Sequence, residues 1–273
     1  MKACMRDVLG KAKQGNFAIP ATNFIDWNSA KAYVEMSEEL NLPLILAFAQ
    51  VHSPYLSLEE AASIGKYFQK KAKTPVVLHL DHGQDLAFIK RAIQLGFNSV
   101  MIDASLDSFE ENVRKTKEVV EIAHEFGVDV EAEIGFVGAN GDVSKNEIKS
   151  IYTNVEDAEK FVQETNVDSL AVSIGTSHGL YKGIPKINFQ RLSELRNVLN
   201  IPLVLHGGSG SGDDNLNRCA REGISKINIY SDFMDAGAKS VSEKLFTNYI
   251  DVLKASREGM KTTLKHDCYY LNC

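Results

Sequence analysis

A chain of 273 residues with 44% hydrophobic and 24% charged side chains has the composition of a soluble globular protein. Its formal net charge of −6 provides no overall basic field for a phosphate backbone, which argues against a nucleic acid partner. No apolar run approaches the roughly 20 residues of a membrane span, and residues 1–7 lack the apolar block of a signal peptide. We therefore expect a cytoplasmic protein with no membrane partner.

The four cysteines form no CxxC pair and no regular framework; they are Cys4, Cys219, Cys268 and Cys273. This pattern predicts free thiols in a reducing compartment. A metal clip built from His266, Cys268 and Cys273 is disfavoured, because structural metal sites need a fuller set of regularly spaced ligands.

Short apolar runs rich in β-branched residues alternate with amphipathic stretches along the chain. The candidate strands are residues 17–24, 42–48, 76–81, 99–104, 128–135, 169–175, 202–207 and 224–231. Helical periodicity lies between them, for example in residues 108–126. Regular alternation of strands and helices is typical of a parallel sheet covered on both faces.

Eight such units favour a (β/α)8 TIM barrel of the α/β class. An open doubly wound sheet usually has fewer strands and carries a GxGxxG sequence after its first strand, and no such sequence follows Phe24. No linker, low-complexity tract or internal repeat interrupts the pattern, so we predict that residues 1–273 form a single domain.

Polar residues gather at the predicted carboxyl ends of the strands, which is where a barrel carries its active site. They are Asn23, Asp81, His82, Asp103, Glu131, Glu133, His178, His206, Asn228 and Ser231. Any one of them alone could cap a helix or satisfy a backbone group. Three histidines and several acids in one layer would be costly to desolvate without a charged partner, and this indicates a divalent metal ion.

The three histidines His82, His178 and His206 would supply nitrogen ligands and leave positions open, as in catalytic zinc sites; cobalt is an alternative. Strand alternation makes His79 a face-mate of Asp81, whereas His82 lies at the turn. We therefore expect His79 to support the site or to pack in the barrel.

Two glycine-rich stretches, residues 175–179 and 207–210, would let backbone N–H groups approach an anion. In barrels the usual phosphate pocket is built from the loops after strands seven and eight. With Lys182, Ser209 and Ser231 nearby in the predicted fold, the pattern favours a phosphate site here.

Seven stretches resemble the zinc-dependent class II ketose-bisphosphate aldolases, the family that includes fructose- and tagatose-bisphosphate aldolase. They are VLHLDHG (77–83), SVMIDAS (99–105), EENV (110–113), VEAEIG (130–135), SIGTSHG (173–179), LHGGSG (205–210) and KINI (226–229). The resemblance implies reversible cleavage of a ketose 1-phosphate or 1,6-bisphosphate to dihydroxyacetone phosphate and an aldehyde. It also implies a homodimer, which is the commonest assembly in general.

By this resemblance His82, His178 and His206 hold the catalytic zinc, and Asp81 exchanges a proton with the C4 hydroxyl. Asp103 and Glu133 correspond to a second or alternative position for a metal or monovalent cation. The residues assigned to the 1-phosphate and the dihydroxyacetone part are Asn23, Gly179, Lys182, Gly207, Gly208, Ser209, Asn228 and Ser231. The class I route would instead need a lysine Schiff base, and Lys226 is the only lysine that we place within a barrel strand.

The sequence departs from the family pattern after the fifth strand, where Gly141 replaces a glutamate that shuttles the C1 proton. Asp142 and Glu147 are candidate substitutes, and we assign Asp142 to the catalytic set. At the end that would hold the far phosphate, Ala49 replaces a serine and Ile250 replaces an arginine from the neighbouring subunit.

Because phosphate binding depends on charge-assisted contacts, we expect a ketose 1-phosphate whose aldehyde half carries no phosphate. A new distal pocket of His52, Tyr55, Tyr230 and Arg257 is the alternative. Two other functions remain open: a sugar-phosphate epimerase or other metal enzyme on the same barrel, and a non-catalytic sugar-phosphate-binding protein.

Overall fold

The computed structural model describes residues 2–135, 152–177, 183–243 and 245–273. Their strands form a closed parallel barrel in the order β1-β2-β3-β4-β5-β6-β7-β8, with β8 paired to β1. The strands are β1 (Ile19–Asn23), β2 (Leu44–Ala49), β3 (Val76–Gly83), β4 (Ser99–Ile102), β5 (Asp129–Ile134), β6 (Ser169–Val172), β7 (Leu203–Leu205) and β8 (Ile224–Ile229). The prediction of a (β/α)8 barrel is confirmed.

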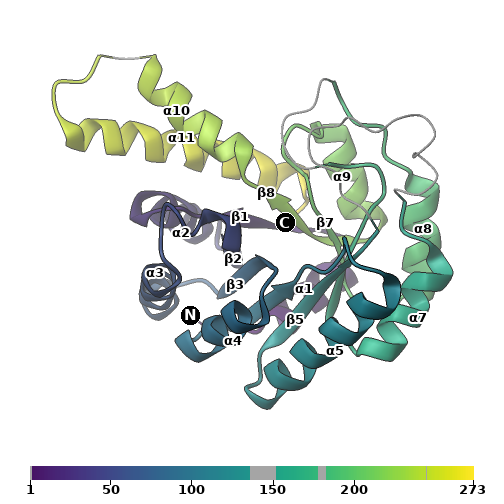
Figure 1. Ribbon diagram of the computed structural model, residues 1–273. Coiled ribbons are helices and arrows are strands. Elements are labelled where there is room, and N and C mark those ends of the chain that lie inside the picture. Colours follow the sequence, from purple (N-terminus) through teal and green to yellow (C-terminus); the bar gives the residue numbers. More distant parts are fainter. Residues whose placement is uncertain (1, 136–151, 178–182, 244) are drawn as a thin grey trace.

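Helices follow the strands and cover the outside of the barrel (Figure 1). They are α1 (Met5–Gly15), α2 (Trp27–Leu40), α3 (Leu58–Lys71), α4 (Leu86–Leu95), α5 (Phe109–Glu125), α7 (Val155–Thr165), α8 (Phe189–Val198), α9 (Asp213–Glu222), α10 (Ser231–Ser242) and α11 (Tyr249–Tyr270), with a short 3₁₀ helix η1 (Gln50–His52) after β2. A continuous core of aliphatic and aromatic side chains fills the space between the strands and these helices. The strands therefore hold their carboxyl ends in a fixed layer.

Local sequence signals set the starts and ends of the helices. Asp26 and Ser57 each form a capping box at the start of α2 and α3, which satisfies backbone N–H groups that have no partner inside a helix. Asn16 and Asn41 end α1 and α2 in the left-handed conformation that asparagine tolerates. The capping boxes begin helices on the side of the polar strand ends, whereas Asn16 and Asn41 lie in the short loops that lead into β1 and β2 on the opposite side.

The last two helices form an antiparallel hairpin that projects beyond the barrel (Figure 1). Their backbones approach closely because of Gly259, where a Cβ atom would lie 2.4 Å from the carbonyl oxygen of Ala236. The end of α11 returns to the barrel, where the carbonyl of Leu271 accepts a hydrogen bond from the N–H of Ala18, just before β1.

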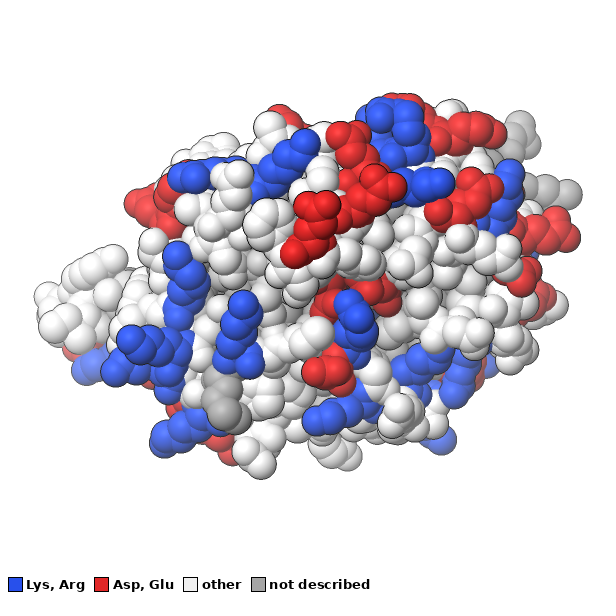
Figure 2. Space-filling view, turned by 90° about the horizontal axis from the view of Figure 1, so that it is seen from below, with Lys and Arg blue, Asp and Glu red and all other residues white. Residues whose placement is uncertain are grey.

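The surface carries charges of both signs. On the face seen from below, Lys and Arg side chains are interspersed with Asp and Glu side chains (Figure 2). No helix in the described part of the chain has the length and apolar character needed to cross a membrane.

The packing of α11 can be tested by pH, because Asp267 near the end of this helix is a buried acid. The carboxyl is buried, and its Oδ2 has no hydrogen-bond partner among the described residues. Burial raises the pKa of Asp267 to about 7, although a hydrogen bond with His266 opposes the rise. The pKa of an unfolded aspartate is about 3.9, so the folded chain binds this proton more tightly.

We expect the stability that Asp267 contributes to be complete below pH 4 and to be lost as the pH rises through 7. Asp267→Asn should therefore unfold with a free energy that depends less on pH over this interval. Urea unfolding of both proteins from pH 4 to 8 measures the difference. A constant difference between them would contradict the buried, protonated state.

Candidate active site and metal centre

A cavity of about 650 Å³ opens at the carboxyl ends of the strands. Its lining includes most of the described residues that the sequence assigns to the site, namely Asn23, Asp81, His82, Asp103, Glu133, Gly207, Ser209, Asn228 and Ser231. The barrel therefore brings together side chains from β1, β3, β5 and β8 and from the loops between strands and helices.

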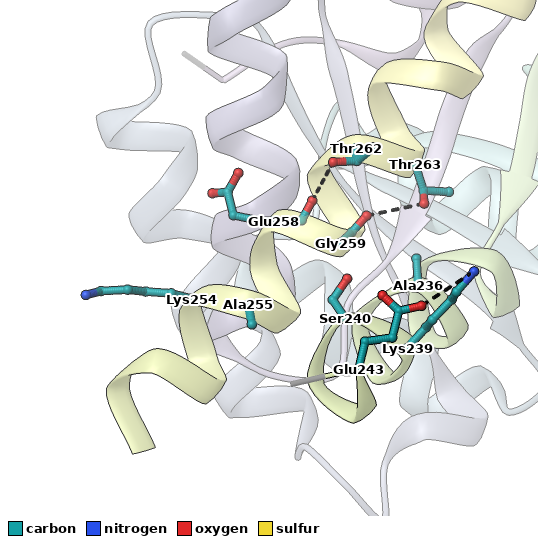
Figure 3. A pocket seen from close by; sticks show the side chains of 10 residues that line it. All are labelled: Ala236, Lys239, Ser240, Glu243, Lys254, Ala255, Glu258, Gly259, Thr262 and Thr263. Carbon is teal, nitrogen blue, oxygen red and sulfur yellow. Dashed lines mark hydrogen bonds and ion pairs between the residues drawn. The ribbon is translucent and has the colours of Figure 1, made fainter. Parts of the chain in front are cut away.

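A second hollow, of about 660 Å³, lies between α10 and α11 (Figure 3). Its polar groups make contacts within their own helix: Lys239 lies 3.9 Å from Glu243, and Thr263 donates to the carbonyl of Gly259. These side chains do not converge on a common point in Figure 3. We therefore place the candidate site in the barrel cavity.

His82 reaches that cavity through an irregularity in β3. Between Leu80 and Gly83 the strand advances three residues while β4 advances two, from Val100 to Ile102, so β3 contains a bulge. His82 itself has a φ of 47°, in the left-handed region that is uncommon for residues other than glycine. The bulge turns His82 into the cavity beside Asp81, although neighbours in a regular strand face opposite sides.

His82 and His206 point their ring nitrogens at each other, with His82 Nε2 and His206 Nδ1 2.9 Å apart. The other nitrogen of each ring is held by a carboxylate: His82 Nδ1 donates to Asp103 (2.7 Å), and His206 Nε2 donates to Glu131 (2.9 Å). Such partners fix the tautomer and orientation of metal-binding histidines. The two remaining nitrogens, His82 Nε2 and His206 Nδ1, therefore face each other.

The carboxylates around the two rings carry a large buried negative charge. Burial raises the pKa of Glu133 to about 8, against the lowering effect of His82, and Glu133 Oε2 has no hydrogen bond among the described residues. Burial lowers the pKa of His82, but Asp81 and Asp103 raise it to about 9. Glu133 and His82 therefore retain protons at neutral pH. A bound cation could replace these protons and compensate the negative charge of the carboxylates.

The donor set fits a divalent metal ion. Ligand atoms of Asp81, His82 and His206 lie within 4.8 Å of one another, and so do those of His82, Asp103 and Glu133. Imidazole nitrogen with carboxylate oxygen is a donor set that suits zinc and similar borderline ions. Asp103 contacts Nδ1 of His82 directly, which gives it a means of orienting that ring.

Asp81 is fixed from two sides of the cavity. Asn23 of β1 and Asn228 of β8 each donate from Nδ2 to one of its carboxylate oxygens, both at 2.9 Å. Burial would raise the pKa of Asp81, but the charges of His82 and Lys226 hold it well below its usual range. Asp81 is therefore an ionised carboxylate with a fixed position next to the histidine pair.

The glycine-rich loop after β7 lies close to its neighbours. Gly207 has a φ of 68°, and a Cβ atom there would lie 2.3 Å from the carbonyl oxygen of Ser177. Gly208 does not line the cavity; its N–H donates to the carbonyl of Asn228 at the end of β8. Ser209 and Ser231 do line it, so the loops after β7 and β8 form one wall.

Four predicted site residues, Asp142, His178, Gly179 and Lys182, lie outside the described residues. At the distal side, the alternative pocket of His52, Tyr55, Tyr230 and Arg257 forms only in part. His52 and Tyr230 line the cavity, but Tyr55 and Arg257 do not. Arg257 lies 3.4 Å from Glu35 of α2, because α11 packs against that helix outside the barrel.

The sequence placed Glu131 in the polar layer and Lys226 in a barrel strand, but it did not predict that the two form a pair. Both side chains are fully buried inside the barrel, with Lys226 Nζ 2.9 Å from Glu131. Burial would raise the pKa of Glu131, but Lys226 and His206 lower it to about 2, so Glu131 stays ionised and accepts from His206. A lysine in the apolar run of residues 224–229 was the available signal.

The fold and this cluster define a barrel enzyme with a buried donor set for a metal ion. The model of the class II fructose-bisphosphate aldolase family matches residues 3–273. The chain is similar to the YdjI aldolase from Escherichia coli K12, with 32% identity and a TM-score of 0.91 over 99% of this chain and 97% of that one. It is also similar to the fructose-bisphosphate aldolase of Campylobacter jejuni, with 25% identity and a TM-score of 0.85 over 100% and 96%.

The chain belongs to the class II fructose-bisphosphate aldolase family. The family carries out retro-aldol cleavage of small sugar phosphates and is generally metal-dependent, so this protein is an aldehyde-lyase. The prediction of the family from the seven stretches is confirmed.

Lys226→Met tests the ion pair between Lys226 and Glu131, the carboxylate that orients His206. It leaves the buried Glu131 carboxylate without its cation, and we expect a loss of about 3 kcal/mol in the free energy of unfolding. Adding Glu131→Gln should recover most of this loss, because the amide is neutral and its oxygen still accepts from His206. Urea unfolding in the presence of a chelator measures both effects without a metal contribution.

The exposed Lys239→Met, on α10, is the matched control and should change the free energy of unfolding by less than about 0.5 kcal/mol. Equal losses in Lys226→Met and in the double variant would show that Glu131 does not depend on Lys226.

Proposed function

We propose that this protein is a zinc-dependent aldolase that cleaves the C3–C4 bond of a ketose 1-phosphate and releases dihydroxyacetone phosphate. The observation that carries the proposal is the fixed, ionised Asp81 carboxylate beside the converging nitrogens of His82 and His206. Asp81 can accept a proton while a metal ion held by the histidines stabilises the negative charge that develops on the substrate. Retro-aldol cleavage needs both effects at once.

The zinc ligands in this proposal are His82, His178 and His206, with Glu133 and Asp103 near enough for an alternative metal position or a second cation. When bound, the zinc ion supplies a positive charge near the C2 carbonyl and C3 hydroxyl, where negative charge develops. Glu131 and Asp103 keep the His206 and His82 rings oriented toward it.

Asp81 accepts the proton of the C4 hydroxyl as the C3–C4 bond breaks. The electron pair of that bond moves toward the C2 carbonyl, and the C4 oxygen becomes the carbonyl of the aldehyde product. Asn23 and Asn228 hold the two oxygens of Asp81 in place during this transfer. A proton must then reach C3 of the ketose, which becomes the hydroxymethyl carbon (C1) of dihydroxyacetone phosphate, and we assign its delivery to Asp142.

The 1-phosphate is assigned to the wall that contains Gly207, Ser209 and Ser231, together with Gly179 and Lys182. Gly208 contributes by holding this loop against β8. Backbone N–H groups of such loops, with hydroxyls nearby, are the usual phosphate ligands of a barrel.

We also propose that the protein is located in the cytoplasm. The four cysteines are free thiols, which supports a reducing compartment.

We propose a homodimer as the assembly. Three large apolar side chains are exposed on a single chain at the tip of the α10–α11 hairpin, namely Leu245, Tyr249 and Ile250. Burial against a second copy would remove them from water.

Paired substitutions separate the two roles in the site. His206→Ala should lose bound zinc and cleavage together. Asp81→Ala should retain zinc and lose cleavage by about 10²–10⁴-fold, because it removes only the proton acceptor. Metal analysis of the purified proteins and the rate of dihydroxyacetone phosphate release measure the two properties.

Asp251→Asn, at the exposed start of α11, is the control and should leave both properties unchanged. An unaffected rate in Asp81→Ala would remove Asp81 from its role. Removal of zinc with a chelator should abolish release of dihydroxyacetone phosphate, and added zinc should restore it. An epimerase or a binding protein would release none under either condition.

A further inference from the structure

We infer that the end of the cavity formed by His52 and Tyr230 binds the aldehyde half of the substrate as an uncharged, hydroxylated carbon chain. This inference deepens the proposed aldolase function and rests on it. It excludes a second phosphate or a carboxylate as the group that occupies this end.

The two rings lie across the end of β1. His52 belongs to η1 after β2, Tyr230 directly follows β8, and both β2 and β8 pair with β1 in the barrel. Their ring centroids are 4.6 Å apart and their planes are inclined by 38°. Asn23 on β1 and Asn228 on β8 hold the carboxylate of Asp81, and all three residues line the same cavity as the two rings. A substrate whose C4 hydroxyl reaches Asp81 would extend its remaining carbons toward the rings.

The charges around this end disfavour an anion. In the described part of the chain, no lysine or arginine lines the cavity, whereas Asp81, Asp103 and Glu133 all do. A phosphate at this end would meet neither a described cation nor the glycine-rich loop assigned to the 1-phosphate, and the carboxylates that line the cavity would repel it. The occupant of this end is therefore a neutral group.

His52 supplies the polar recognition. The residue is 8% exposed, and its buried Nδ1 makes no hydrogen bond with the described residues. Burial lowers its pKa, so the ring is neutral and offers one donor and one acceptor. A substrate hydroxyl can pair with either the donor or the acceptor nitrogen of the ring, while an anionic oxygen can use only the donor.

Apolar side chains complete this end of the cavity. Ala49 and Val51, which are next to His52 in or beside η1, line the cavity together with Tyr230. The C–H faces of a polyhydroxylated chain can pack against such a surface while its hydroxyls reach the polar groups. The predicted loss of the serine at Ala49 and of the arginine at Ile250 fits the same assignment.

The test uses the zinc-loaded enzyme in the direction of synthesis, with dihydroxyacetone phosphate and matched aldehydes. We compare glyceraldehyde with glyceraldehyde 3-phosphate, and erythrose with erythrose 4-phosphate. We expect kcat/KM to be about tenfold or more higher for the unphosphorylated member of each pair. A preference for the phosphorylated members overturns this inference alone. Absence of any carbon–carbon bond formation overturns the aldolase proposal as well.

Variants of His52 test whether recognition of the uncharged aldehyde depends on this residue. His52→Phe keeps an aromatic ring but removes both nitrogens, and we expect it to raise KM for erythrose about tenfold with KM for dihydroxyacetone phosphate and zinc content unchanged. His52→Gln keeps a donor and an acceptor and should recover part of the loss. Tyr55→Phe, an exposed position outside the cavity, is the control. If His52→Phe raises KM for both substrates equally, or if His52→Gln behaves like it, the specific role of His52 is overturned.

Discussion

The structure depends on compensating a layer of buried acids at the carboxyl ends of the strands. Asp81, Glu131 and Glu133 are almost completely buried there, and three carboxylates in one interior cannot all stay ionised without positive charge. Lys226 compensates Glu131 from within the barrel. His82 compensates Asp81 and Asp103, and Glu133 keeps a raised pKa. The remaining negative charge is what makes this layer a site for a divalent cation.

The same charge arrangement gives Glu131 and Asp81, two carboxylates of similar burial, different roles. Glu131 is bound to Lys226 and His206, so it acts by orienting a ring. Asp81 is bound only to neutral amides of Asn23 and Asn228 and faces the cavity, so it remains able to take a proton. The difference comes from their partners, because both groups are ionised and both lie inside the barrel.

The sequence was sufficient for the fold and for much of the cavity, because strand periodicity and polar strand ends are local signals. The limits are physical. Residues 173–175 continue an apolar or small-residue pattern, and His206 with Gly207 directly follows an apolar run, but none of these residues is in the sheet, so β6 and β7 end earlier than predicted. The bulge that turns His82 inward depends on pairing with β4, which no spacing within β3 reveals. The contact of Lys226 with Glu131 crosses the barrel between residues 95 positions apart.

The cavity thus recognises its two ends by different means. One wall is made of glycines and serines at the loops after β7 and β8, where close backbone approach is available because Gly207 has no side chain to meet Ser177. The other is made of aromatic and aliphatic side chains around His52. The acidic layer lines the same cavity, where it attracts a cation and repels a second anion. An occupant with a charge at one end only matches this asymmetry, because each of its parts then meets a surface that compensates it.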